Sequence, residues 1–234
     1  MNVSRESGNS SLLSIMQLSD SFFPTGMYTM SNGLEMLFYQ NKVKRAEQLE
    51  RLIHSYLRMQ VGVTDCVALG NAIDAAKESN VKTIIETDQT LYVMKLVKAT
   101  REAYVRSGIQ LVNCVDSFTR NNSLNRYKKA IGDGKATGVY PVALGVVCSA
   151  CEISKPDAAF VLLYSSSVSL VGAALRLGMI DHNEGQKIIH DMKPTILEVA
   201  KNVNKPLRSM WQFFPVLDIA QMMHERYENK MFLT

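Results

Sequence analysis

Residues 158–175 read AAFVLLYSSSVSLVGAAL, an uncharged run that closes at Arg176. Its length approaches the roughly 20 apolar residues that a membrane-spanning helix needs. A group of serines interrupts the run, and a helix that is uncharged all round is equally typical of the centre of a soluble bundle. The stretch therefore predicts a buried central helix and no membrane span.

The segments next to this run carry the signals of helix termini. Ser154 and Asp157 have the spacing of an N-cap and the third helical position, which predicts the start of the central helix. Asn183 and Gln186 repeat this pattern and predict the start of the next helix. Pro194 should end or kink that helix, because proline removes a backbone donor.

The half of the chain before the run shows the helical period as well. Between Leu49 and Leu57, apolar residues follow the i, i+3, i+4, i+7, i+8 spacing, which predicts a surface helix. The same spacing continues from Leu91 to Phe118 and predicts one long helix, softened at Gly108. No run alternates Val, Ile and Thr with polar residues as a strand would. We therefore predict an all-α protein.

The chain shows no internal repeat, low-complexity tract or long linker. We predict a single-domain helical bundle of roughly ten helices over residues 12–220. Residues 1–11 lack the cationic and apolar regions of a signal peptide, which predicts a disordered leader and a cytoplasmic protein. Residues 221–234 are expected to form a C-terminal docking tail that orders on a partner.

The composition excludes some classes of function. Of 234 residues, 47% are hydrophobic and 21% charged, as in a globular domain. The net charge of +4 comes from scattered Lys and Arg without a basic block, so no binding to nucleic acid is expected. Four cysteines are too few for a disulfide framework in a chain of this length, and we expect free thiols.

Two motifs resemble chemical sites but lack their essential parts. Cys148 and Cys151 have redox or zinc spacing, yet they lie in an apolar run without a second ligand pair. We interpret them as small residues of a packed helix. The loop 132–138 has Gly134 and Lys135 in the order of a phosphate-binding loop, but it lacks the earlier glycine and follows a predicted helix. This loop is expected to be a solvated connector.

The histidines give no sign of a catalytic centre either. None belongs to a His-Glu-x-x-His pair or to a visible nucleophile arrangement, so isolated surface positions are expected. These residues are His54, His182, His190 and His224. We therefore predict that the chain is not an enzyme.

One stretch, PTGMYTMSNGLE at residues 24–35, forms a Pro-set turn and a Gly hinge ahead of a short helix. This stretch closely resembles the N-terminal signature of the UreF-type urease accessory proteins. The resemblance runs in family order over Leu12 to Thr234, with departures at residues 179–182 and with Lys230 and Thr234 in place of Arg and Ser. The other segments that carry it are TREAYVRSG (100–108), YPVALG (140–145), residues 176–187 and the ending HERYENKMFLT (224–234).

The resemblance implies an all-α homodimer that bridges a UreD or UreH accessory protein to the GTPase UreG. The assembly delivers nickel to the urease apoprotein, so nickel and GTP would be handled by the partners and this chain would need no cofactor. The signature stretch would belong to a complex-forming surface, and Tyr227 and Phe232 would dock on UreD or UreH with polar tail residues at the rim. The partner-binding residues implied are Tyr28, Ser31, Gly33, Glu35, Arg101, Glu102, Gln186, His224, Glu225, Tyr227, Lys230 and Phe232.

Two alternatives stay open at this point. The chain could regulate GTP hydrolysis by inserting a cation, for which Lys135 is a candidate. It could instead be a nickel-binding carrier that uses Cys148, Cys151 and histidines.

Overall fold

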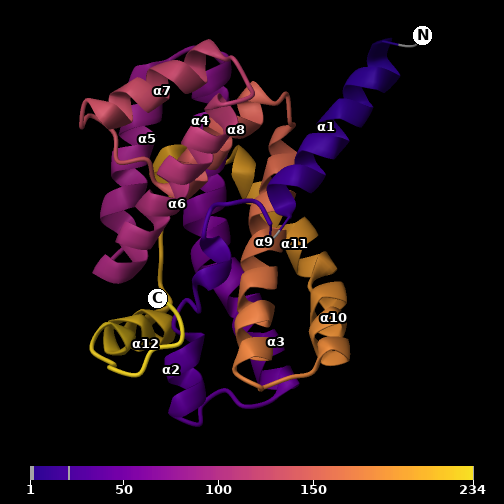
Figure 1. The fold of residues 1–234 in the computed structure, drawn as a ribbon, viewed down its shortest axis with the longest axis vertical. Coiled ribbons are helices and arrows are strands. Elements are labelled where there is room, and N and C mark those ends of the chain that lie inside the picture. The colour runs from indigo at the N-terminus through magenta and orange to yellow at the C-terminus, as the bar shows by residue number, and fades with distance from the viewer. Residues whose placement is uncertain (1–2, 21, 234) are drawn as a thin grey trace.

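The computed structural model describes residues 3–20 and 22–233, and every regular element in these residues is helical (Figure 1). The prediction of an all-α fold is confirmed. The α-helices are α1 (Val3–Ser19), α2 (Leu34–Tyr39), α3 (Ala46–Tyr56), α4 (Cys66–Lys77), α5 (Val81–Met94), α6 (Lys98–Asp116), α7 (Asn122–Gly132), α8 (Tyr140–Ala150), α9 (Lys155–Arg176), α10 (His182–Asp191), α11 (Lys193–Val199) and α12 (Pro215–Glu225). The 3-10 helices are η1 (Met27–Thr29), η3 (Ala200–Asn204) and η4 (Leu207–Ser209), and η2 (Leu57–Asp65) is a π-helix.

Helix α9 is the buried central helix that its uncharged sequence predicts. The Ser154 hydroxyl caps it by accepting a hydrogen bond from the Asp157 amide at 3.3 Å. Its packing partners include α1 to α4, α8, α10 and α11. The hydroxyls of Ser166 and Ser167 donate hydrogen bonds to backbone carbonyls one turn earlier in the same helix. Among the described residues it alone is long and apolar enough to cross a membrane, yet most of it lies inside the protein.

Helix α8 packs against α4 on one side and α6 on another. A Cβ atom at Gly108 of α6 would lie 2.0 Å from the carbonyl oxygen of Gly138, so only glycine permits this approach of α6 to the start of α8. Helix α6 continues through Gly108 without interruption. The predicted softening at this residue is therefore wrong, and close packing is its structural role.

The long helix predicted over residues 91–118 is in fact two helices. Helix α5 ends at Met94, Lys95 takes an extended backbone conformation, and α6 begins at Lys98. The side chain of Lys95 turns into the core, where its Nζ lies 2.6 Å from Oδ1 of Asp65. Pairing of these two buried charges fixes the turn and overrides the helical period of the surrounding apolar residues.

Helix α10 starts two residues earlier than predicted. Its N-cap is Asp181, whose carboxylate accepts from the Glu184 amide at 2.8 Å while Glu184 accepts from the Asp181 amide at 2.9 Å. A charged carboxylate is a stronger acceptor than the amide of Asn183, which explains the shift. The helix ends before Pro194, as predicted, and this proline opens α11.

The N-terminal leader is helical from Val3 onward, so the prediction of disorder is wrong for residues 3–11. The later turns of α1 pack against α9, with Leu18 buried and Ile15 partly buried. Once that part is nucleated, each further residue adds a hydrogen bond at little cost. Figure 1 shows the start of α1 extending away from the bundle. Helices α1 and α12 run through the proposed boundaries at residues 12 and 220, which stay predictions.

Candidate functional site

Two segments from opposite ends of the chain meet beside α2: the signature segment (residues 24–35) and the tail (residues 221–234). Helix α12 packs against α2, and Figure 1 shows the two helices next to each other near the C-terminus. The sequence resemblance singled out the two segments separately. In the structure they form one site.

The carboxylate of Glu35 is the centre of this site, and it has no exposed surface. Its Oε2 lies 2.6 Å from Nε2 of His224, and its Oε1 accepts a hydrogen bond from the Met231 amide at 2.8 Å. The Phe232 amide adds a longer bond of 3.4 Å to Oε2. Each oxygen of a carboxyl group can take part in more than one hydrogen bond, so this single buried group contacts one tail side chain and two tail amides.

The tail therefore packs on its own chain. Phe232 is buried, with the guanidinium of Arg176 4.4 Å from its ring centre, and the Tyr227 ring lies 5.4 Å from that of Tyr39. In the described residues Phe232 packs on its own chain, and its docking on a partner stays a prediction. His224 is also buried and not at a rim, because its imidazole contacts the buried carboxyl group of Glu35 inside the protein.

Gly33 and Gln221 hold α12 against the signature segment. Gly33 has φ +87° at the start of α2, and a Cβ there would lie 3.1 Å from Cγ of Gln221. The Gln221 amide donates to the Asn32 carbonyl at 3.3 Å and accepts from the Thr100 hydroxyl at 2.7 Å. One side chain thus connects α12 to both the signature segment and α6.

Two further predicted residues, Arg101 and Glu102, lie near this junction on α6. The Arg101 guanidinium donates to the Lys95 carbonyl at 3.0 Å. The exposed Glu102 lies 3.8 Å from Nζ of Lys98. Glu225 of α12 accepts from the Ala99 amide at 2.7 Å, which ties the end of α12 to the start of α6.

The remaining predicted residues take different positions. Ser31 is fully buried, so it does not lie on the surface that was expected to include it, and the same holds for Glu35. Lys230 is exposed, and its Nζ donates to the Glu225 carbonyl at 3.1 Å. Gln186 is exposed on α10, on the other side of α9 from α12 (Figure 1). The side chain of Tyr28, in η1, lies outside the described part. Whether any of these residues binds a partner stays a prediction.

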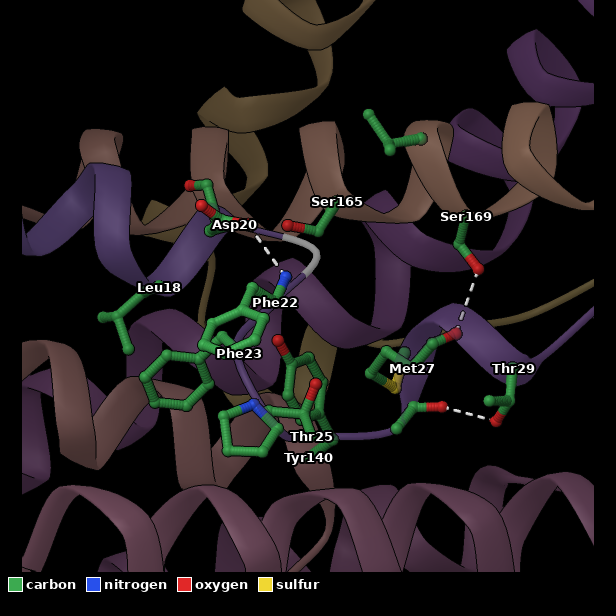
Figure 2. Close-up of a pocket in the computed structure, with 14 residues that line it drawn as sticks. Leu18, Asp20, Phe22, Phe23, Thr25, Met27, Thr29, Tyr140, Ser165 and Ser169 are labelled. Carbon is green, nitrogen blue, oxygen red and sulfur yellow. Dashed lines mark hydrogen bonds between the residues drawn. The ribbon is translucent and has the colours of Figure 1, made fainter.

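A hollow of about 290 Å³ lies between residues 18–29 and helices α8 and α9. Figure 2 shows the Ser169 hydroxyl pointing to the Met27 carbonyl, to which it donates at 3.1 Å. Phe22 stands at this hollow with 92% of its side chain exposed. Tyr140 also lines the hollow, and burial raises the pKa of its hydroxyl well above the usual range. The hollow is lined mainly by apolar groups, and no reactive pair faces it.

Sequence reasoning missed Asp88, which fixes the end of the glycine-rich loop. Its carboxylate accepts from the amides of Gly138 and Val139 at 3.0 and 2.9 Å, and from the Thr137 hydroxyl at 2.7 Å. A signal was present, since this acid falls on the apolar face of α5 next to Ile84 and Leu91. The loop is a connector, as predicted, but it is anchored.

The cysteines show no chemical activation. Cys148 is buried and Cys151 half-buried, both are free thiols, and burial raises the pKa of each. The prediction that both cysteines are buried in a packed helix is confirmed for Cys148 and wrong for Cys151, which follows the last residue of α8 and is half-buried. Across residues 3–20 and 22–233, no group of three or more His, Cys, Asp or Glu side chains is placed to hold a metal ion.

Sequence comparison with known proteins identifies relatives along most of the chain. A sequence model of the UreF family matches residues 43–193. The chain is 33% identical over 221 residues to urease accessory protein UreF of Trichodesmium erythraeum (strain IMS101), covering 94% of this chain and 95% of that protein. It is 28% identical over 225 residues to the protein of the same name from Bacillus sp. (strain TB-90), covering 95% and 99%. UreF 1 of Brucella melitensis is 29% identical over 224 residues, covering 95% and 92%. The chain therefore belongs to the UreF family.

Proposed function

We propose that this chain is a non-enzymatic scaffold of urease maturation. It bridges a UreD or UreH accessory protein to the GTPase UreG while nickel is delivered to the urease apoprotein. Its relatives are named urease accessory proteins, and this supports a role in urease maturation. The observation that carries the scaffold role is the division of α12 into a pinned inner face and an exposed apolar outer face.

The inner face of α12 is fixed by Gln221 and His224, which bind α6 and the signature segment. The outer face exposes Val216, Ile219 and Met222 at 52%, 55% and 46% of their surface. Exposed apolar patches of this kind mark protein–protein interaction sites. The Glu35 contacts hold the helix rigid, so it presents this face in a fixed position. We assign the outer face of α12 to the UreD or UreH partner.

Substitution of Ile219 by Asp tests this assignment. It places a charge in the outer face without disturbing a buried contact, so stability should change by less than about 0.5 kcal/mol. Co-elution with UreD or UreH should be lost. Phe118→Asp is the matched control, since Phe118 is 53% exposed at the far end of α6 and should leave co-elution intact. Equal co-elution of both variants would contradict the assignment.

Removal of the tail from Tyr227 to Thr234 is a second test of the scaffold. The truncation removes the two amides that donate to Glu35, and α12 should lose its fixed position. We expect co-elution with UreD or UreH to disappear. Unchanged co-elution would show that the tail does not contribute to the complex.

We propose that nickel and GTP are handled by the partners and that this chain regulates GTP hydrolysis or nickel release. Lys135 is exposed within the anchored loop and stays the candidate for a regulatory cation. Unchanged GTP turnover of the assembled complex with Lys135→Ala would exclude it. Equilibrium dialysis should find no stoichiometric nickel on the isolated chain. Tight nickel binding that a Cys148→Ser/Cys151→Ser variant loses would favour the carrier alternative.

Self-association is part of the proposal. An apolar hollow of about 430 Å³ lies between α1, α9 and α11, and Met16, Tyr164 and Leu197 are exposed there. A second copy of the chain would cover this face and form a homodimer. Free thiols at all four cysteines fit a cytoplasmic location. Light scattering should report a dimer for the wild type and for Phe118→Asp, and a monomer for Tyr164→Asp. A dimeric Tyr164→Asp variant would place the contact elsewhere.

A further inference from the structure

A second hollow flanks the signature segment, on the side of α6. It is lined by residues 24–26, 29 and 30 of the signature segment and by Ala103 and Ser107 of α6. Leu233 of the tail also lines the hollow, and its amide donates to the Thr29 carbonyl at 3.2 Å. We call this hollow the α6 slot. It is assembled from the signature segment, α6 and the tail, the same three parts that the Glu35 and Gln221 contacts hold together.

The α6 slot carries a single charge. Of the described residues that line it, Arg106 alone is charged, and it is exposed. Within the described part of the chain, no hydrogen bond, ion pair or ring contact engages its guanidinium. The nearest acid on the same helix, Glu102, is 3.8 Å from Lys98. The slot therefore presents an unpaired cation beside the apolar side chains of Met30 and Leu233.

The size of the slot restricts what can enter it. Its volume is about 270 Å³, at the lower limit of the roughly 300–1,000 Å³ of small-molecule sites. The space suits side chains of a partner protein. A guanidinium pairs with a carboxylate through two parallel hydrogen bonds, so charge complementarity selects an acidic residue.

We propose that the α6 slot receives an acidic side chain and a neighbouring apolar side chain of UreG, with the carboxylate paired to Arg106. The inference rests on the proposed bridging function. A bridge must bind its second partner away from the surface that holds the first. The outer face of α12 is assigned to UreD or UreH, and no described residue of α12 lines the slot.

Reversal of the charge at Arg106 tests the proposal. The Arg106→Glu variant, purified as a complex with UreD or UreH, should bind UreG about tenfold more weakly or worse, because like charges then face each other. Arg106→Lys should retain part of the affinity. Lys98→Glu is the matched control, since Lys98 is an exposed cation two turns earlier on α6 and lies outside the slot. Biolayer interferometry at two salt concentrations should show a smaller salt effect for Arg106→Ala than for wild type.

A carbodiimide treatment of the Arg106→Lys complex identifies the partner residue. The reagent joins the introduced amine to a carboxylate in direct contact, and mass spectrometry should find the cross-link on a UreG Asp or Glu. The proposal would be overturned if the Arg106→Glu variant bound UreG with wild-type affinity. It would also be overturned if the variant lost UreD or UreH and not UreG. If the wild-type complex retains no UreG at all, both the slot and the bridging function fail, whereas a loss specific to the Arg106 variants supports both.

Discussion

Within the described residues, two buried pairs of polar side chains have the same contact distance and serve different parts of the protein. Asp65 and Lys95 are 2.6 Å apart inside the bundle, and Glu35 and His224 are 2.6 Å apart where the ends of the chain meet. One oxygen of Asp65, Oδ2, has no hydrogen-bond partner, whereas both oxygens of Glu35 are used. The first pair sits among helices that a large core already holds together. The second is the main attachment of a tail with few buried apolar groups.

The largest effect is expected from Lys95→Met. This change leaves the carboxylate of Asp65 buried without its cation, which should lower the free energy of unfolding by about 3–5 kcal/mol. Urea denaturation followed by circular dichroism measures the loss. The double variant Asp65→Leu/Lys95→Met removes both charges and should recover most of it. If the double variant is as unstable as the single one, packing and not the buried charge determines the loss.

A smaller and local effect is expected from Glu35→Ala. The change removes the acceptor of His224 and of two tail amides, and it should cost about 1–3 kcal/mol. Limited proteolysis should cut the chain after Arg226 while the bundle stays folded. Glu35→Gln keeps one acceptor oxygen and should release the tail less. If Glu35→Ala lowered the free energy of unfolding of the whole bundle as much as Lys95→Met does, the two pairs would not differ in their roles.

Gly33→Ala should weaken the same junction through the backbone. A residue with a Cβ at φ +87° costs about 1–2 kcal/mol, and the added methyl would press on Gln221. The thermal unfolding temperature should fall, and the tail should become sensitive to protease. Gly134→Ala is the control for backbone strain alone, because Gly134 has φ +70° but no atom within 4 Å of an added Cβ. If Gly134→Ala also releases the tail, the contact between residue 33 and Gln221 is not the cause of the release.

The smallest effect concerns Cys66, which reports on the first pair alone. Burial raises the pKa of its thiol, and the neighbouring Asp65 charge raises it further, so the thiolate is scarce at pH 8. A disulfide reagent should leave Cys66 unmodified in the native wild type and in Glu35→Ala. Lys95→Met should expose it to modification. Rapid labelling of Cys66 in Glu35→Ala would mean that release of the tail opens the bundle.

The fold was largely predictable because its strongest signals are local. The uncharged run at residues 158–175 and the cap at Ser154 describe α9 correctly. The break between α5 and α6 was not predictable, since the apolar period continues through Lys95 and only a distant Asp65 redirects its side chain. In the site, His224 was predicted to be a surface residue because it belongs to no metal-binding or catalytic motif in the sequence. Its partner, Glu35, lies 189 residues away, and local patterns carry no information on such a contact.

The central claim is that the tail docks on Glu35 of its own chain and so joins the two ends into one site. Hydrogen exchange of the Met231 and Phe232 amides in the isolated protein tests it most directly, since both amides donate to that carboxylate. The account predicts protection of both amides in the wild type and exchange near the unprotected rate in Glu35→Ala. Rapid exchange in the isolated wild type, with protection appearing only after UreD or UreH is added, would contradict the account and show that the partner orders the tail.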